Sequence, residues 1–145
     1  MIKRIALAAA LAGLGVTAVV AQSDPLAARK ALMKENGAQS RVAREMIEGK
    51  QPFDLAAAQK VLATFAAVDD KGKSLWPATS KDGDTASLPA VWENKADFDA
   101  RFAKFAQDVA AAQAGIVDEA SFKKLAPAVF KNCGGCHELY KAKSG

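Results

Sequence analysis

The sequence predicts an all-α protein that folds as an antiparallel, up-down-up-down bundle of four helices. Apolar residues recur at spacings of three and four in separate stretches, which is the period of helices with one buried face. No stretch shows the alternating pattern of a half-buried strand. The connections between the stretches are short to moderate, which favours antiparallel neighbours in a bundle.

The first helix is predicted from Pro25 to Glu48, because a capping residue precedes the proline and Gly49 is a typical stop signal. A short turn follows, and Asp54 is expected to cap the second helix. The apolar stripe of the second helix consists of Leu55, Ala58, Val61, Leu62, Phe65 and Val68.

Residues 69–88 lose the helical pattern and are predicted to form one long loop, interrupted by Leu75-Trp76-Pro77. The third helix is expected to begin near Asn94, and Asp118 is expected to cap the fourth. The apolar positions of the third helix are Phe98, Phe102, Phe105, Val109, Ala112 and Ile116. Those of the fourth are Phe122, Leu125, Val129, Cys133, His137 and Tyr140.

Residues 1–21 have the pattern of a bacterial secretory signal peptide: a cationic start, an uncharged apolar run and small or compact residues up to Ala21. A retained membrane anchor is the alternative, but the run is short for a span. We expect cleavage after Ala21 and a periplasmic location. The remaining residues, 22–145, form one domain by length, with no further run apolar enough to cross a membrane.

Charge argues against a nucleic-acid partner. Loss of Lys3 and Arg4 with the signal lowers the formal charge from +4 to only +2. No basic stripe is interleaved with aromatic residues, as nucleic-acid binding would favour.

Cys133-Gly134-Gly135-Cys136-His137 is the attachment signature of a c-type haem. The two thiols can add to the two vinyl groups of one porphyrin, and His137 then lies where a ring nitrogen can bind the iron. The chain contains two cysteines and one histidine, so nothing else competes for these roles. The pattern predicts one haem c, with its iron, per chain.

Three other uses of this motif are weaker. A zinc site needs four ligands, and the motif supplies three. A thioredoxin-like redox pair would accompany a βαβ pattern, and none is visible. A disulfide between these cysteines would close a loop too small to stabilise the chain much.

The motif near the C-terminus, with Tyr140 and Lys141 after it, resembles the class II cytochromes c, the four-helix cytochrome c' family. The resemblance covers residues 22–145 and includes the turn from Gly49 to Asp54 and the pair Val91-Trp92. The segment from Leu32 to Gly37 is most similar to the low-spin cytochrome c-556 branch, which implies that Met33 is the second axial ligand.

Helix geometry tests the choice between Met33 and Met46. Met33 lies eight residues after Pro25, and His137 lies eight residues before the C-terminus. At 1.5 Å per residue both lie roughly 12 Å from the same end of an up-down bundle. Met46 is about 20 Å further along and is expected to pack in the core. Packing on the distal face, without a bond to iron, is the alternative for Met33.

Arg29 lies one turn before Met33, and the resemblance implies that it contacts a haem propionate; a solvated position is the alternative. Trp76 is expected either to cover a haem edge or to anchor the long loop.

Three function classes remain. The first is a periplasmic electron carrier with His/Met ligation and redox partner proteins; the second is a five-coordinate protein that binds nitric oxide or carbon monoxide. The third is a haem-bearing interaction subunit. No acid/base dyad, nucleophile or phosphate loop indicates an enzyme, and the sequence allows a monomer or a homodimer.

Overall fold

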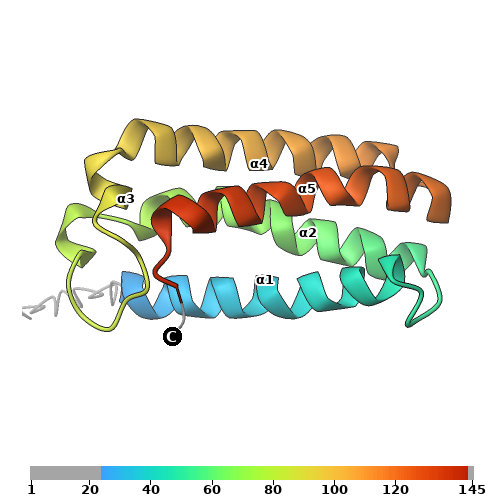
Figure 1. The fold of residues 1–145 in the computed structure, drawn as a ribbon, viewed down its shortest axis with the longest axis horizontal. Helices are drawn as coiled ribbons and strands as arrows, with labels where there is room; N and C mark the ends of the chain where they lie inside the picture. The colour runs from blue at the N-terminus through green and yellow to red at the C-terminus, as the bar shows by residue number, and fades with distance from the viewer. Residues whose placement is uncertain (1–23, 144–145) are drawn as a thin grey trace, which may run out of the picture.

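The computed structural model describes residues 24–143, and four long helices dominate this range (Figure 1). They are α1 (Pro25–Ile47), α2 (Leu55–Gly72), α4 (Lys95–Gly115) and α5 (Glu119–Tyr140). The short helix α3 (Ala90–Glu93) precedes α4. The expected all-α, up-down-up-down bundle is confirmed; the signal-peptide prediction falls outside the described residues.

Local capping explains where the helices begin and end. The Asp54 carboxylate accepts a hydrogen bond from the Ala57 amide at 2.7 Å, and Asp118 forms a capping box with Ser121. The chain leaves α1 through Gly49, whose φ of +70° favours glycine. These three boundaries match the sequence prediction.

The segment between α2 and α4 differs from the prediction. The second helix continues to Gly72, and two short 3₁₀ turns follow, Lys73–Leu75 and Ala78–Ser80. A side chain at position 72 could not fit, because an ideal Cβ there would lie 2.7 Å from a ring carbon of Phe102. Leu55 was wrongly assigned to the buried stripe: it is 40% exposed, since it is the first residue of α2, at the tip of the bundle.

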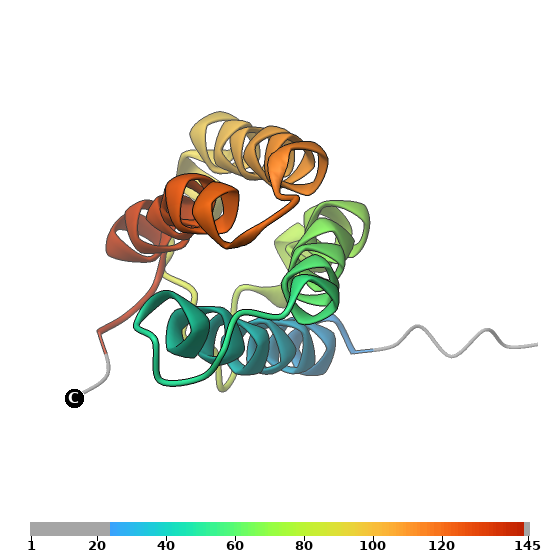
Figure 2. The same cartoon turned by 90° about the vertical axis from the view of Figure 1, so that its right-hand side faces the viewer.

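Figure 2 shows the long helices end on, arranged around a common core. The helix α1 packs on α2, α2 on α4 and α4 on α5, whereas α1 and α5 meet less closely than these three pairs. The larger apolar cluster includes Met46, which is 1% exposed, so the expectation that this residue packs in the core is confirmed.

A second apolar cluster lies near the C-terminal end of α5. Its buried members are Leu32, Val68, Trp76, Val91, Phe98, Phe102 and Tyr140. The chain after α5 is tied to the long loop, because the Leu88 amide donates to the Tyr140 carbonyl and the Ala142 amide to the Ala86 carbonyl. The loop therefore closes the end of the bundle that carries the cysteine motif.

Candidate haem-binding site

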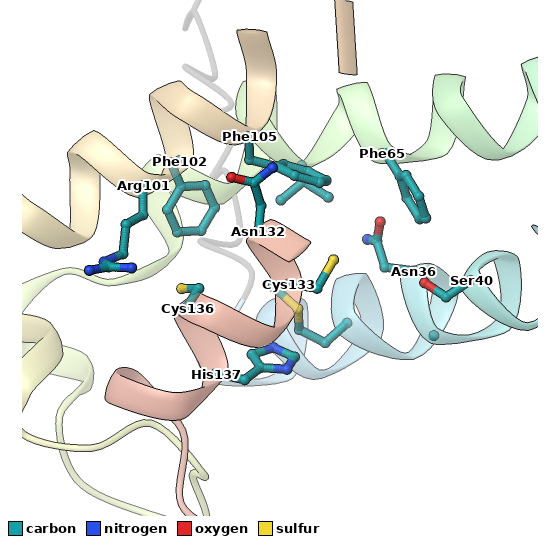
Figure 3. A pocket seen from close by; sticks show the side chains of 13 residues that line it. Asn36, Ser40, Phe65, Arg101, Phe102, Phe105, Asn132, Cys133, Cys136 and His137 are labelled. Carbon is teal, nitrogen blue, oxygen red and sulfur yellow. The ribbon is translucent and has the colours of Figure 1, made fainter. Parts of the chain in front are cut away.

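Helix α5 carries the whole motif on its last two turns. Figure 3 shows Cys133, Cys136 and His137 projecting from this helix, with Cys133 and His137 on the side that faces α1. Both cysteines are free thiols and partly buried, whereas His137 is exposed. Within residues 24–143 no three His, Cys, Asp or Glu side chains gather as a metal-binding cluster.

Two open cavities meet at this motif. Counting the open space at its mouth, one spans about 700 Å³ and reaches toward the middle of the bundle, and the other spans about 900 Å³ and extends under the long loop. Both are lined by Met33, Phe102, Cys136 and His137. The structure therefore brings together the residues predicted as attachment point, proximal ligand and distal ligand, whereas Met46 borders neither cavity.

The wall of the first cavity is largely apolar: Phe65, Val68, Phe102 and Phe105 come from α2 and α4.

Burial raises the pKa of the Cys133 and Cys136 thiols, so both favour the neutral form. Although His137 is exposed, the protein atoms around its ring desolvate it in part, and this effect, followed by the positive charge of Lys141, lowers its pKa and favours the neutral imidazole that can bind a metal.

Arg29 is 3% exposed, so the solvated alternative for this residue is wrong. Its guanidinium donates hydrogen bonds to the Leu75 carbonyl at 3.1 Å and to the Ser80 hydroxyl and carbonyl at 3.0 and 3.1 Å. It also lies 5.5 Å from the centroid of the Trp76 ring. The residue thus anchors the long loop to α1.

One donor of Arg29 remains unused. Its Nε is buried and donates to no acceptor in the described part of the chain. Arg29 also lines the second cavity. Desolvation lowers the pKa of Arg29, and the negative charge of Asp24 offsets only part of this effect.

Trp76 is 7% exposed and packs against Phe98 and Phe102, with ring centroids 5.2 and 5.4 Å apart. Its indole nitrogen donates to the Ser87 hydroxyl at 3.1 Å. The residue anchors the loop and also lines the second cavity, so the two alternatives for it are compatible.

Sequence reasoning missed a polar cluster that holds the motif against α4. The Asp97 carboxylate accepts hydrogen bonds from Arg101 Nε at 2.7 Å and from the Tyr140 hydroxyl. Arg101 also donates to the carbonyl of Gly135, inside the motif, and lines the first cavity. The spacing of four between Asp97 and Arg101 was a visible signal, but the contacts with α5 were not.

The site fits a haem by chemistry as well as by size. Gly37 lines the first cavity, and an ideal Cβ built on it would meet nothing within 4 Å, so the glycine keeps space open. A haem carries its vinyl groups and its anionic propionates on opposite edges. Both cysteines line the first cavity, and Arg29 lines the second together with Cys136, so the site offers groups suited to both edges.

Comparison with known proteins agrees with this geometry. The family model described as cytochrome C' matches residues 24–141. The chain belongs to the cytochrome c' family. A cytochrome c' of Rhodopseudomonas palustris is 46% identical over 141 residues, 97% of each chain. A cytochrome c-556 of the same organism is 33% identical over 150 residues, the whole of both chains.

Solved structures extend the likeness to the fold. Cytochrome c' from R. palustris superposes with a TM-score of 0.82 at 45% identity, covering 86% of this chain and 100% of that one. Oxidised cytochrome c556 from the same organism gives a TM-score of 0.76 at 31% identity, with the same coverage. Membership of this cytochrome family makes haem c the cofactor. Over residues 24–143, no helix combines the length and hydrophobicity needed to cross a bilayer.

Proposed function

We propose that this cytochrome is a periplasmic carrier of single electrons rather than an enzyme. In this proposal Cys133 and Cys136 would hold the haem covalently, and His137 and Met33 would bind its iron. The bound haem would supply an iron that alternates between the ferric and ferrous states.

The observation that carries the proposal is the position of Met33. It lies on α1, opposite the motif helix, and lines both cavities together with His137. It also packs against the same apolar cluster as Cys136, so both elements are held on a rigid wall. A thioether and an imidazole on two facing helices suit an iron that must keep both ligands through a redox change.

The rest of the site supports this role. The aromatic wall of the first cavity would offer an apolar surface to the porphyrin, and the buried Nε of Arg29 would offer a donor to a propionate. Trp76 covers the second cavity under the long loop. His137 is exposed, which leaves one edge of the site open to redox partner proteins.

A second function, binding of nitric oxide or carbon monoxide by five-coordinate iron, has one observation in its favour: the relative at 46% identity is named cytochrome c'. In that case Met33 would be a wall residue and the distal position would be free. Exposure of the reduced wild-type holoprotein to carbon monoxide separates the two. Slow or weak uptake supports His/Met ligation, and rapid saturation supports the gas binder.

Export is tested separately. We propose that the chain is cleaved after Ala21, so that the periplasmic protein begins at Gln22. The intact mass of the natively expressed holoprotein checks this, and a mass that includes residues 1–21 would refute cleavage.

A further inference from the structure

Asn36 places an unused hydrogen-bond acceptor inside the first cavity. It lies on α1, three residues after Met33 and on the same helix face. Its Nδ2 donates to the Leu32 carbonyl at 2.8 Å. Its Oδ1 is buried and receives no hydrogen bond from the described residues. Figure 3 shows the amide projecting from α1, with the oxygen turned away from the helix.

The orientation of this amide follows from its surroundings. Turning it over would place Oδ1 against the Leu32 carbonyl, and two acceptors facing each other repel. The oxygen is therefore held toward the cavity, whose wall on α2 is apolar and whose other polar lining residues are Ser40, Arg101, Asn132 and His137. A buried acceptor without a donor is costly, so such a group in a native structure calls for an explanation.

Space and a second polar group lie beside the Asn36 oxygen. The volume beside Gly37 is open, since an ideal Cβ there would meet nothing within 4 Å. Ser40, one turn further along α1, lines the same cavity, and Figure 3 shows its hydroxyl directed back toward Asn36. A small polar molecule in this space would find two partners, the minimum that holds a buried water in place.

We propose that Asn36 makes the cavity beside Met33 selective for small molecules that donate a hydrogen bond, such as water or hydrogen sulfide, over carbon monoxide, which can only accept one. Such a molecule donates a hydrogen bond to the buried Asn36 oxygen. Carbon monoxide would leave this oxygen unpaired and would lie against the lone pairs of the oxygen. This inference rests on the proposed function, because it concerns the position that Met33 would vacate.

The test uses holoprotein in which Met33→Ala opens the cavity. Asn36→Leu is then added, because leucine has a similar size and no acceptor. We expect the affinity of the ferric protein for hydrogen sulfide to fall about fivefold, and that of the ferrous protein for carbon monoxide to rise about fivefold, as one net hydrogen bond allows. Gln39→Leu is the matched control, since this amide on α1 lines neither cavity, and it should change neither affinity.

Outcomes distinguish this inference from the proposed function. If the Asn36→Leu variant changes neither affinity by more than about twofold, the selectivity proposal is wrong whatever the role of Met33. If the wild type binds carbon monoxide as readily as the Met33→Ala variant does, the ligation proposal is wrong. In that case the effect of Asn36→Leu on the same two affinities is measured in the wild-type background, where it tests the selectivity proposal by itself. Asn36→Ala repeats the comparison if the leucine variant does not load haem, and unchanged affinities there would also overturn the inference.

Discussion

The two methionines of α1 provide a matched pair of substitutions. Met33→Ala and Met46→Ala make the same chemical change 13 positions apart on one helix. Met46 is 1% exposed within the main core, and Met33 is half-buried at the junction of the two cavities. We therefore expect Met46→Ala to affect mainly the stability of the fold and Met33→Ala to affect mainly the haem iron.

Met46→Ala should lower the free energy of unfolding by about 2–5 kcal/mol, because it leaves a sealed void in a close-packed core. Met33→Ala should lose about 1 kcal/mol of packing, because half of a methionine is buried there and no closed void results. Its larger effect should be on the iron: a high-spin spectrum, fast carbon monoxide uptake and a lower reduction potential, since a thioether favours the ferrous state.

Denaturant unfolding measures the first effect, and absorption spectroscopy with redox titration measures the second. If Met46→Ala changed the haem spectrum, or if Met33→Ala left both the spectrum and the potential unchanged, the assignment of the distal ligand would be refuted.

Three further predictions test other parts of the site. Haem should stay with the wild-type chain during acid–acetone extraction and should be extractable when Cys133 and Cys136 are both alanine. Arg29→Lys keeps the charge but loses the planar, multiple-donor guanidinium, so it should loosen residues 73–80. We expect faster hydrogen exchange in this segment and a free energy of unfolding lower by about 1–3 kcal/mol. Unchanged exchange would contradict the anchoring role. The hydrogen bonds from Arg101 and then from Tyr140 hold the pKa of Asp97 below its usual range, so this carboxylate stabilises the fold above about pH 4 and the contribution is lost as pH falls. Asp97→Asn should therefore flatten the loss of stability in acid, measured as the unfolding midpoint against pH.

Features encoded by neighbouring residues were predictable from the sequence. The caps at Asp54 and Asp118 and the glycine after α1 are local signals, and the structure follows them. The haem motif was recognisable because its chemistry requires a fixed spacing within five residues. The helical period then indicated a bundle, which placed Met33 level with His137.

Features that depend on distant contacts were not predictable. Phe102, which lies close against Gly72 at the end of α2, is 30 residues away in the sequence, and the partners of Arg29 lie 46 and 51 residues away. The exposure of Leu55 follows from its place at the end of a helix, which periodicity alone does not reveal. Likewise, only the three-dimensional structure shows that the Asn36 oxygen is buried without a donor.

The absorption spectrum of the oxidised wild-type holoprotein at neutral pH tests the central claim most directly. If Met33 and His137 both bind the iron, the spectrum should be that of low-spin, six-coordinate ferric haem, with the weak long-wavelength band of a thioether–iron bond. A high-spin ferric spectrum without that band would contradict the proposed ligation and favour the gas-binding function.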